Sequence, residues 1–481
     1  MSEAKKERRE VSRRRFLKYG AGVVVVGAAA AAAYYALTPP SPPAPPTPTP
    51  TTTEITTVPT PTAITTAKEE PEKPNELHVL MEDFGYVGQM VSNLYEERYG
   101  IPVKMEYTDW SGVYSKMVTD AISGRDKALY DVVEVWPLGG RDLYKYRYLG
   151  ALDEFMMKSG NTLDKILGLA SVTKEMNSID GLTYTVPFGF FPHILNYRTD
   201  LYKEAGLTGP PETIAQVLEY SKKLVKKSGG KTETYGFLDS WGDDNAYESW
   251  LTYLAAFGGA EFDEQGNYTM SSQYTPAVKA LTWMREIWES GSVVPETITF
   301  FNTGDQARLF RTGVAGQEVI PAWVYYWYNA SDSAIAGKFV GANVPGEPPI
   351  KTGTCDPATG FGVTAKGNPY WGWKWIETFV FDPHVQFDYA TNLAWGFNAP
   401  PTLKAIYEPP WRDRAFSANP YLALLEEAYR NPILWPSTAH TTEIYKEALN
   451  PILHLGITGE LSVAQALDEC GAKIREILAR P

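Results

Sequence analysis

Apolar and polar residues alternate along the first part of the folded region in a way that predicts an α/β fold. Short apolar runs at Leu77–Met81, Ile101–Tyr107 and Tyr130–Trp136 are typical of strands. Between them, Met90–Tyr99 and Tyr114–Ile122 place apolar side chains three or four residues apart, as amphipathic helices do. The order strand, helix, strand, helix, strand predicts a parallel sheet with crossover helices.

The segment Tyr184–Tyr202 is apolar and rich in aromatic residues. Pro187 and Pro192 exclude a continuous helix, and Gly189 between them gives the backbone freedom to bend. On this pattern the segment is either a buried, bent strand or a crossover between two lobes. In the second interpretation Gly189 is a hinge and Phe188 lies at the mouth of a ligand cleft.

The downstream pattern predicts further strands and helices and no internal repeat. The expected strands are Ile194–Tyr197, Tyr235–Leu238, Ala315–Pro321 and Gly360–Ala365. A helix is expected to begin at Asp200, a favourable N-cap residue. The other expected helices are Leu149–Met157, Glu212–Lys227, Tyr247–Phe257, Pro276–Ser290, Asp305–Arg311, Pro369–Val380, His384–Thr391, Tyr421–Arg430, Ile444–Leu455 and Val463–Leu478.

The N-terminal region resembles a twin-arginine export signal followed by a stalk. Ser12–Lys18 reads S-R-R-R-F-L-K, and the uncharged run Tyr19–Leu37 has 19 residues, enough to span a bilayer. The basic flank, within 1–18, places the N-terminus in the cytoplasm and the body outside. Residues 38–74 contain 12 Pro and 12 Thr, a composition that favours an extended linker. A stalk favours an uncleaved anchor over a released, secreted protein.

Charge and composition narrow the classes of function. The net charge is −13, and residues 1–18 carry +5, so the remainder carries −18, which argues against nucleic-acid partners. Cys355 and Cys470 are too few for a disulfide scaffold, and their pairing stays open. The histidines are scattered without metal-ligand spacing, and the chain lacks nucleophile-elbow, phosphate-loop, zinc-protease and dinucleotide motifs. We therefore expect no metal, no cofactor and no catalytic residues.

Carboxylates lie among aromatic residues in one segment. Asp243–Asp244 follows Trp241, and Tyr247, Glu248 and Trp250 come next. Carboxylates accept hydrogen bonds from sugar hydroxyls, and aromatic rings stack on the C–H faces of a sugar. The same residue types could serve as the acid and base of a glycosidase, because sequence gives no carboxylate separation.

Four segments follow one another in a characteristic order and spacing, at Gly181–Leu201, Ala205–Thr213, Phe310–Trp323 and Leu455–Leu467. Together they resemble the extracellular solute-binding proteins of ABC importers, the family that includes maltose and trehalose binders. Their order and spacing carry the resemblance more than any one of them. Gln317 and Glu318 depart from the small and Met residues usual at those positions.

The resemblance implies a two-lobe, periplasmic-binding-protein-like α/β fold of type II, with a ligand cleft between lobes that the chain crosses more than once. Lobe one would comprise 76–187 and 300–345, and lobe two 188–299 and 346–481. It also implies a permease and an ATPase as partners, and closure of the lobes over ligand.

The resemblance also implies ligand-binding positions. Trp136 matches an aromatic residue at the end of the third strand, and Trp323 an aromatic residue after a turn; both would stack on sugar. The alternative for each tryptophan is a core residue, and for each carboxylate a solvated or capping residue. The other expected ligand-binding residues are Asp83, Phe188, Trp241, Asp244, Glu248, Trp395 and Trp435.

The sequence therefore predicts a monomeric, membrane-tethered, extracytoplasmic receptor that binds an oligosaccharide and is not an enzyme. If the signal is cleaved, the protein is secreted. Two alternatives stay open: a secreted glycoside hydrolase, and a peptide or polyamine receptor on the same fold.

Overall fold

The computed structural model describes most of the chain beyond the N-terminal region. The chain divides into two compact units, Met1–Glu70 and Pro71–Pro481, and apart from Glu70 the described residues belong to the second. The predicted export signal, the apolar run and the linker up to residue 69 lie outside them. Within the described ranges no helix is long and apolar enough to cross a membrane. Those ranges are 70–83, 87–136, 143–144, 146–166, 178–179, 181–242, 246–262, 268–299, 303–356, 359–392, 400–428, 433–434 and 440–480.

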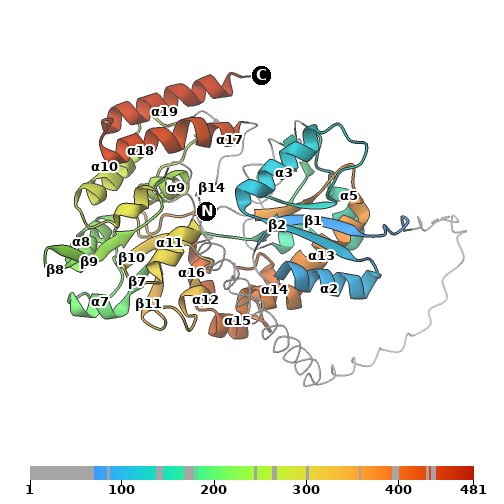
Figure 1. Cartoon of the computed structure of the whole chain (residues 1–481), viewed down its shortest axis with the longest axis horizontal. Coiled ribbons are helices and arrows are strands. Elements are labelled where there is room, and N and C mark those ends of the chain that lie inside the picture. Colours follow the sequence, from blue (N-terminus) through green and yellow to red (C-terminus); the bar gives the residue numbers. More distant parts are fainter. Residues whose placement is uncertain are drawn as a thin grey trace, which may run out of the picture. The chain divides into compact units, whose positions relative to one another are not determined.

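One five-stranded sheet contains the predicted parallel strands. β1 runs parallel to β2 and β3, whereas β13 runs antiparallel to β3 and β6. α2 (Val87–Tyr99) joins β1 to β2, and α3 (Trp110–Ile122) joins β2 to β3, which confirms the predicted alternation (Figure 1). The strand order is β2 (Val103–Thr108), β1 (Leu77–Glu82), β3 (Val132–Val135), β13 (Thr359–Val363) and β6 (Val186–Gly189).

Helices cover both faces of this first sheet. Val79 and Met81 of β1 pack in one buried cluster with Val91 of α2. Leu80 packs in a different cluster with Val113 of α3. Because successive side chains of a strand point to opposite faces, the two clusters lie on opposite sides of the sheet. The continuous apolar runs of these strands follow from burial on both faces.

The second five-stranded sheet is mixed. β7 runs antiparallel to both β10 and β11, β10 runs parallel to β9, and β8 and β9 form a hairpin. α8 (Ile214–Leu224) packs against β9 and β10. The strand order is β11 (Phe339–Asn343), β7 (His193–Arg198), β10 (Ala315–Pro321), β9 (Lys231–Leu238) and β8 (Lys226–Ser228).

A group of helices that includes the end of the chain packs together beside the second sheet. α10 (Thr275–Glu289) contacts α9 (Ala246–Ala256), α18 (Asn450–Thr458) and α19 (Val463–Leu478), and Figure 1 shows α18 and α19 side by side. Ser462 begins α19 with a capping box that includes Gln465.

The remaining elements are short. The helices and 3-10 turns are α5 (Asp153–Ser159), η1 (Leu163–Lys165), α7 (Thr199–Glu204), η2 (Pro295–Ile298), α11 (Thr303–Phe310), α12 (Tyr325–Tyr328), α13 (Pro369–Val380), α14 (Pro383–Thr391), η4 (Lys404–Tyr407), α15 (Arg412–Ala418), α16 (Tyr421–Ala428) and α17 (Thr441–Glu443), with a π-helix η5 (Ile444–Leu449). The strands are β4 (Ser178–Ile179), β5 (Leu182–Thr183), β12 (Cys355–Asp356) and β14 (Ile433–Leu434).

The segment Tyr184–Tyr202 is a crossover, as the second interpretation of its sequence predicts. β6 ends at Gly189 in the first sheet, and β7 begins at His193 in the second. The chain passes back to the first sheet between β11 and β13, and the C-terminal helices again pack with α9 and α10. The chain thus crosses between the two halves more than once.

The sheet pairing differs from the expected lobe boundaries. The segment 300–345 was expected in lobe one, but its strands β10 and β11 pair within the second sheet. The segment 346–481 was expected in lobe two, but β13 pairs within the first sheet and α13 packs against α2. Strand membership is set by long-range pairing, which the apolar pattern of a strand does not encode.

Two local predictions are wrong. α7 begins at Thr199 with Arg198 in the N-cap position, and Asp200 instead accepts a hydrogen bond of 2.8 Å from Arg198 Nε. The helix expected over Glu212–Lys227 ends at Leu224, because the following residues form the hairpin strand β8. The two cysteines, whose pairing was open, are both buried and are not joined to each other.

Candidate functional site

Acidic side chains gather where the parallel strands of the first sheet end. Glu82 is the last residue of β1, and Glu134 lies on β3 with no exposed surface. The Glu134 carboxylate accepts hydrogen bonds from the Glu82 backbone N–H at 2.6 Å and from Thr359 Oγ1 at 2.9 Å, so it ties β1 and β13 to β3. Carboxyl ends of strands are where open α/β sheets bind ligands.

The neighbouring carboxyl groups disfavour ionisation of Glu82 at this edge. Burial raises the pKa of Glu82 well above its usual value, and the charges of Glu134, Asp109, Glu248 and Asp83 raise it further. Burial also raises the pKa of Glu134, and the two hydrogen bonds that it accepts offset this only in part. Glu248 lies on α9, among the helices beside the second sheet. Its charge raises the pKa of Glu82, so carboxyl groups from the two halves of the protein interact electrostatically.

Trp136 stands directly after β3, beside this acidic edge. Its ring is half-buried and stacks on Phe191 of the crossover, with ring centroids 6.0 Å apart and an interplanar angle of 26°. The indole N–H of Trp136 is buried and has no hydrogen-bond partner among the described residues. The structure thus holds, two residues after Glu134, a tryptophan whose ring is stacked on the crossover and whose indole N–H has no partner among the described residues.

Trp323 is half-buried two residues after β10. Its ring stacks on Trp327, with centroids 5.6 Å apart and an interplanar angle of 26°, and Arg311 lies over the Trp327 ring at 5.0 Å. The two indoles form a stacked pair at the end of a strand of the second sheet.

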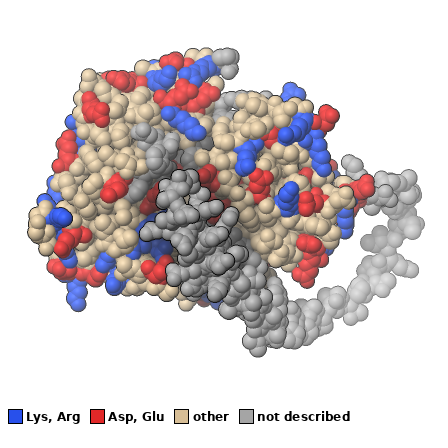
Figure 2. Space-filling view, in the orientation of Figure 1, with Lys and Arg blue, Asp and Glu red and all other residues tan. Residues whose placement is uncertain are grey.

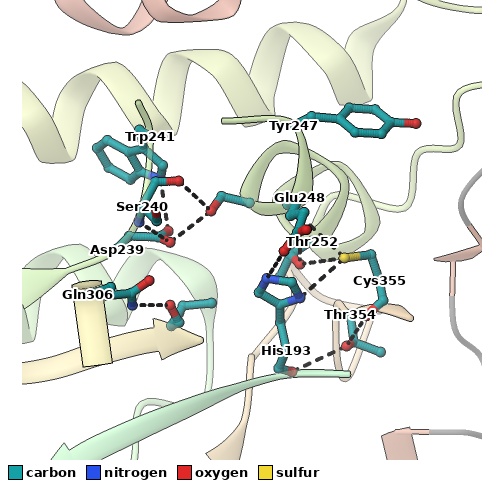
Figure 3. Close-up of polar contacts among 12 residues, drawn as sticks. His193, Asp239, Ser240, Trp241, Tyr247, Glu248, Thr252, Gln306, Thr354 and Cys355 are labelled. Atoms are coloured by element: carbon teal, nitrogen blue, oxygen red, sulfur yellow. Dashed lines mark hydrogen bonds and ion pairs between the residues drawn. The ribbon is translucent and has the colours of Figure 1, made fainter. Parts of the chain in front are cut away.

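On the second half, Asp239 organises a buried network after β9 (Figure 3). Its carboxylate accepts hydrogen bonds from the Ser240 backbone N–H at 2.7 Å, Trp241 Nε1 at 2.8 Å, Ser249 Oγ at 2.7 Å and the Tyr253 hydroxyl. Burial raises the pKa of Asp239 to about 6, although these hydrogen bonds favour the ionised form. Trp241 has no exposed surface, so in this structure it orders the network rather than reaching a ligand.

Glu248 lies at the edge of a second cluster that includes the crossover. Glu248 Oε2 is 3.8 Å from Nε2 of His193, and Nδ1 of His193 is 3.2 Å from the sulfur of Cys355 (Figure 3). The Glu248 side chain is 19% exposed, against 2% for His193. Burial lowers the pKa of His193 to about 3 and raises that of Glu248 to about 8, where the charge of Asp239 also contributes.

The structure moves Phe188 from the expected cleft mouth into the core. Phe188 has no exposed surface and stacks on Phe361 with centroids 4.3 Å apart, within a cluster that includes Phe379. Gly189 is also buried, and an added Cβ there would lie 3.0 Å from Phe191 Cζ. The glycine is thus required by close packing, and its role as a hinge stays a prediction.

Of the four remaining residues expected to bind ligand, the structure describes one. Asp83 is exposed at the end of β1, next to Glu82. Asp244, Trp395 and Trp435 lie outside the described residues, so their expected roles stay predictions.

Sequence reasoning missed several acidic and polar residues at the centre of these clusters. The available signal was an acidic residue within an apolar run, as Glu134 stands in the strand of Tyr130–Trp136. No comparable signal marks His193 or Cys355, because contacts between distant segments bring them together. Within the described part of the chain, no group of three His, Cys, Asp or Glu side chains is arranged to hold a metal ion.

A cavity of about 610 Å³ lies at the opposite end of β1 from the acidic edge. Polar residues line it, and His78 near the start of β1 is one of them. The cavity is therefore separate from the ends of the strands. The other lining residues are Glu72, Lys73, Pro74, Asn75, Glu76, Lys127 and Asn368.

The two sheets, the repeated crossovers and the acidic and aromatic groups at the strand ends define a two-lobe periplasmic-binding-protein fold. The solved structures that share it include MalE3 and GacH. A maltose-bound MalE3 of T. maritima has a TM-score of 0.73 at 22% identity, covering 84% of this chain and 99% of that one. The GacH receptor of Streptomyces glaucescens, solved unliganded and with acarbose, has a TM-score of 0.70 at 18% identity, covering 85% and 99%.

Residues 79–382 match the family described as bacterial extracellular solute-binding protein, and the chain belongs to that family. A probable ABC transporter-binding protein of Deinococcus radiodurans is 23% identical over 277 residues, which cover 55% of this chain. The match spans 61% of the length of that relative. The family resemblance inferred from the sequence is confirmed.

Proposed function

We propose that the chain is the extracytoplasmic solute receptor of an ABC importer and that it binds an oligosaccharide between its two sheets. The observation that carries the proposal is that both halves place acidic and aromatic residues at the ends of their strands, on a fold whose sheets are joined by repeated crossovers. The charge of Glu248, on α9, also raises the pKa of Glu82 at the end of β1, which supports a site to which both halves contribute. The family and the fold support the receptor function.

The chemistry of these groups suits a sugar. Sugar hydroxyls donate to carboxylates, and a carboxyl group with a raised pKa can also donate in its protonated form. Trp136 adds an indole N–H and a ring held by Phe191, on which the C–H face of a sugar can stack. Trp323 offers a second aromatic surface. Asp83, Asp244, Trp395 and Trp435 remain proposed ligand-binding residues on the basis of the sequence.

Closure of the two lobes would couple binding to delivery. The crossover Gly189–His193 connects the sheets, and Gly189 is its proposed hinge. A solute that contacts both Glu82 and Glu248 would favour the closed arrangement, which a permease could then recognise. The proposed partners are a permease and its ATPase, and the proposed state is a monomer.

Membrane attachment is proposed from the sequence alone. The twin-arginine-like segment, the apolar run Tyr19–Leu37 and the Thr/Pro-rich linker favour a body held outside the membrane by its N-terminus. On the face shown in Figure 2, acidic and basic side chains are interspersed, which agrees with the proposal that nucleic acid is not a partner.

A second candidate is a receptor for a polyamine or a basic peptide. The specific observation that favours it is the acidic neighbourhood of Glu82, where all four acting charges are negative. A cation would relieve the mutual repulsion of these carboxyl groups. A glycoside hydrolase remains the alternative outside the receptor class, favoured by carboxyl groups beside aromatic rings.

A thermal-shift screen of the unit Pro71–Pro481 tests these candidates. The panel contains maltose, maltotriose, acarbose, spermidine and a lysine-rich peptide. A ligand at 100 times its dissociation constant stabilises the folded state by about 2.7 kcal/mol. Stabilisation by a sugar without sugar consumption supports the proposal, whereas stabilisation by spermidine alone would replace it with the polyamine receptor. Release of shorter sugars would establish the hydrolase.

Calorimetry on variants then tests the site. Trp136→Ala and Trp323→Ala should each weaken sugar binding by about 1–3 kcal/mol, because each removes an aromatic stacking surface. Trp288→Ala is the control, since Trp288 is half-buried on α10 among the residues packed against the core of the second half. Unchanged affinity in both site variants would remove these tryptophans from the site.

A further inference from the structure

Three segments that are far apart in the sequence meet at His193 (Figure 3). His193 is the first residue of β7, directly after the crossover, and its backbone carbonyl accepts a hydrogen bond of 3.2 Å from Thr354 Oγ1. Cys355 follows on the segment that returns to the first sheet, and its sulfur lies 3.2 Å from His193 Nδ1. Glu248, from the first turn of α9, faces the other ring nitrogen. One imidazole therefore lies where both passages of the chain meet, beside the Cys355 sulfur and 3.8 Å from a candidate ligand-binding carboxyl group.

The hydrogen atoms in this cluster can be arranged in two ways. In the first, the Thr252 hydroxyl donates to the sulfur at 3.3 Å, and the Cys355 thiol donates to the carbonyl of Glu248 at 3.3 Å. His193 Nδ1 must then carry the hydrogen and donate to sulfur, because the thiol proton is already used. Nε2 is left as an acceptor, which matches a protonated Glu248.

In the second arrangement, the Thr252 hydroxyl donates to the carbonyl of Glu248 at 3.2 Å, and the thiol turns to His193 Nδ1. The imidazole hydrogen then sits on Nε2, where it faces Glu248 Oε2 at 3.8 Å and electrostatically favours an ionised Glu248. The two arrangements have the same number of protons on the imidazole, the thiol and the hydroxyl. They differ in the tautomer of His193 and in the form of Glu248 that the tautomer favours.

We propose that His193 is a positioning residue for Glu248, and that its tautomer, set through Cys355, decides whether Glu248 offers the solute a hydrogen-bond donor or an acceptor. The use of this carboxyl group by a solute rests on the proposed function. The tautomer switch itself is a property of the unliganded chain.

The surroundings favour a change of tautomer over a change of charge on the imidazole. His193 and Cys355 are buried, and burial lowers the pKa of His193 to about 3, so the ring stays neutral across the range in which Glu248, with a pKa of about 8, ionises. The charge of Asp239, at the end of β9, raises the pKa of Glu248. The charge of Glu248 in turn raises the pKa of Glu82 on β1. Ionisation of Glu248 therefore affects a carboxyl group on the other half of the protein, across the proposed solute site.

The switch predicts how the cysteine controls the carboxyl group. Cys355→Ala removes the sulfur, and a buried Nδ1–H would then lack its acceptor, so the hydrogen moves to Nε2. Nε2–H stabilises ionised Glu248, and the pH at which Glu248 loses its proton should therefore fall. Cys355→Ser keeps a group that both donates and accepts, and should leave this pH near that of the unchanged protein.

The experiment measures the protonated carboxyl band by infrared difference spectroscopy during a pH titration, with no ligand present. Glu248→Gln identifies the band, and Cys470→Ser is the control, because Cys470 is a second buried thiol outside the cluster. The expected result is a lower midpoint in Cys355→Ala and unchanged midpoints in Cys355→Ser and Cys470→Ser. An equal midpoint in Cys355→Ala, or an equal shift in Cys470→Ser, would overturn the proposal.

A second measurement is made on the unchanged protein, and a variant within the cluster is needed only to assign the signal. Nitrogen NMR of labelled imidazoles reports the tautomer, and with five histidines in the chain a His193→Gln spectrum assigns the signal. The His193 hydrogen should move from Nδ1 to Nε2 as Glu248 ionises; a single tautomer throughout would refute the switch. Maltotriose affinity, measured over the same pH range, tests the proposed function separately. Absence of maltotriose binding would count against a sugar ligand while the spectra still decide the tautomer.

Discussion

Glu318 is a buried acid whose replacement should change how stability depends on pH. It lies on β10 with no exposed surface, at a position where the sequence departs from the family pattern. Its carboxyl oxygens accept hydrogen bonds from Asn196 Nδ2 at 3.0 Å and Gln306 Nε2 at 3.4 Å. Burial raises its pKa from 4.5 to about 8, and the hydrogen bonds offset this only in part.

The direction and size of the effect follow from proton linkage. Because the folded-state pKa is above the unfolded value, the native state binds this proton more tightly. The resulting contribution to stability is complete below pH 4.5 and is lost as the pH rises through about 8. At about 1.4 kcal/mol for each pH unit between the two pKa values, the loss amounts to roughly 5 kcal/mol.

Glu318→Gln removes this ionisation and should flatten the corresponding part of the stability curve. The variant amide keeps an oxygen that can accept from Asn196 Nδ2, as Glu318 Oε1 does at 3.0 Å. Urea unfolding at pH 5 and pH 9 should show a smaller loss of stability between the two values in the variant than in the unchanged protein. Asp239 and Glu261 also have raised pKa values, so the difference between the proteins isolates Glu318.

Glu296→Gln is the matched control, since Glu296 is exposed in η2. Its stability loss between pH 5 and pH 9 should equal that of the unchanged protein. An equal loss in Glu318→Gln would mean that Glu318 ionises without cost in the folded state, and the argument from burial would be wrong.

Two further predictions concern the crossover. Gly189→Ala should destabilise the fold by about 1–3 kcal/mol, because its Cβ would lie 3.0 Å from Phe191 Cζ and 3.2 Å from the hydroxyl of buried Tyr389. Gly209→Ala is the control, because nothing lies within 4 Å of an added Cβ there. Thermal unfolding compares the two variants, and equal midpoints would show that the crossover can shift to accommodate the added methyl group. Phe188→Ala should cost about 3–5 kcal/mol in urea unfolding, because it removes a fully buried ring; a loss below about 1 kcal/mol would contradict its place in the core.

Elements with strong local patterns could be predicted from the sequence, whereas partnerships between distant strands could not. β1, α2, β2, α3 and β3 lie within a few residues of their predicted ranges, because burial on fixed faces leaves a period in the sequence. The apolar pattern does not predict β11. The helix start at Asp200 failed for a local reason, since Arg198 engages that carboxylate.

The candidate site likewise contains residues whose place could be predicted from the local sequence and residues whose place depends on contacts between distant segments. The place of Trp136 directly after β3 could be predicted, because the end of a parallel strand has a defined position relative to the sheet, whereas its contact with a ligand stays a prediction. Phe188 could not, since an aromatic residue in a Pro-rich crossover fits a core and a cleft mouth equally well. The contacts of His193 with Cys355 and Glu248 join positions separated by 162 and 55 residues, and only the folded chain brings them together.

The position of β13 has a consequence for how the protein is made. β6 joins the first sheet through β13, and β13 is encoded after every strand of the second sheet. A ribosome that has released residues up to 345 has therefore produced all of the second sheet but a first sheet with a gap between β3 and β6. Of the two sheets, the one that begins first should therefore be completed last, and a chain stopped at that point would expose the unpaired edges of β3 and β6 to other chains.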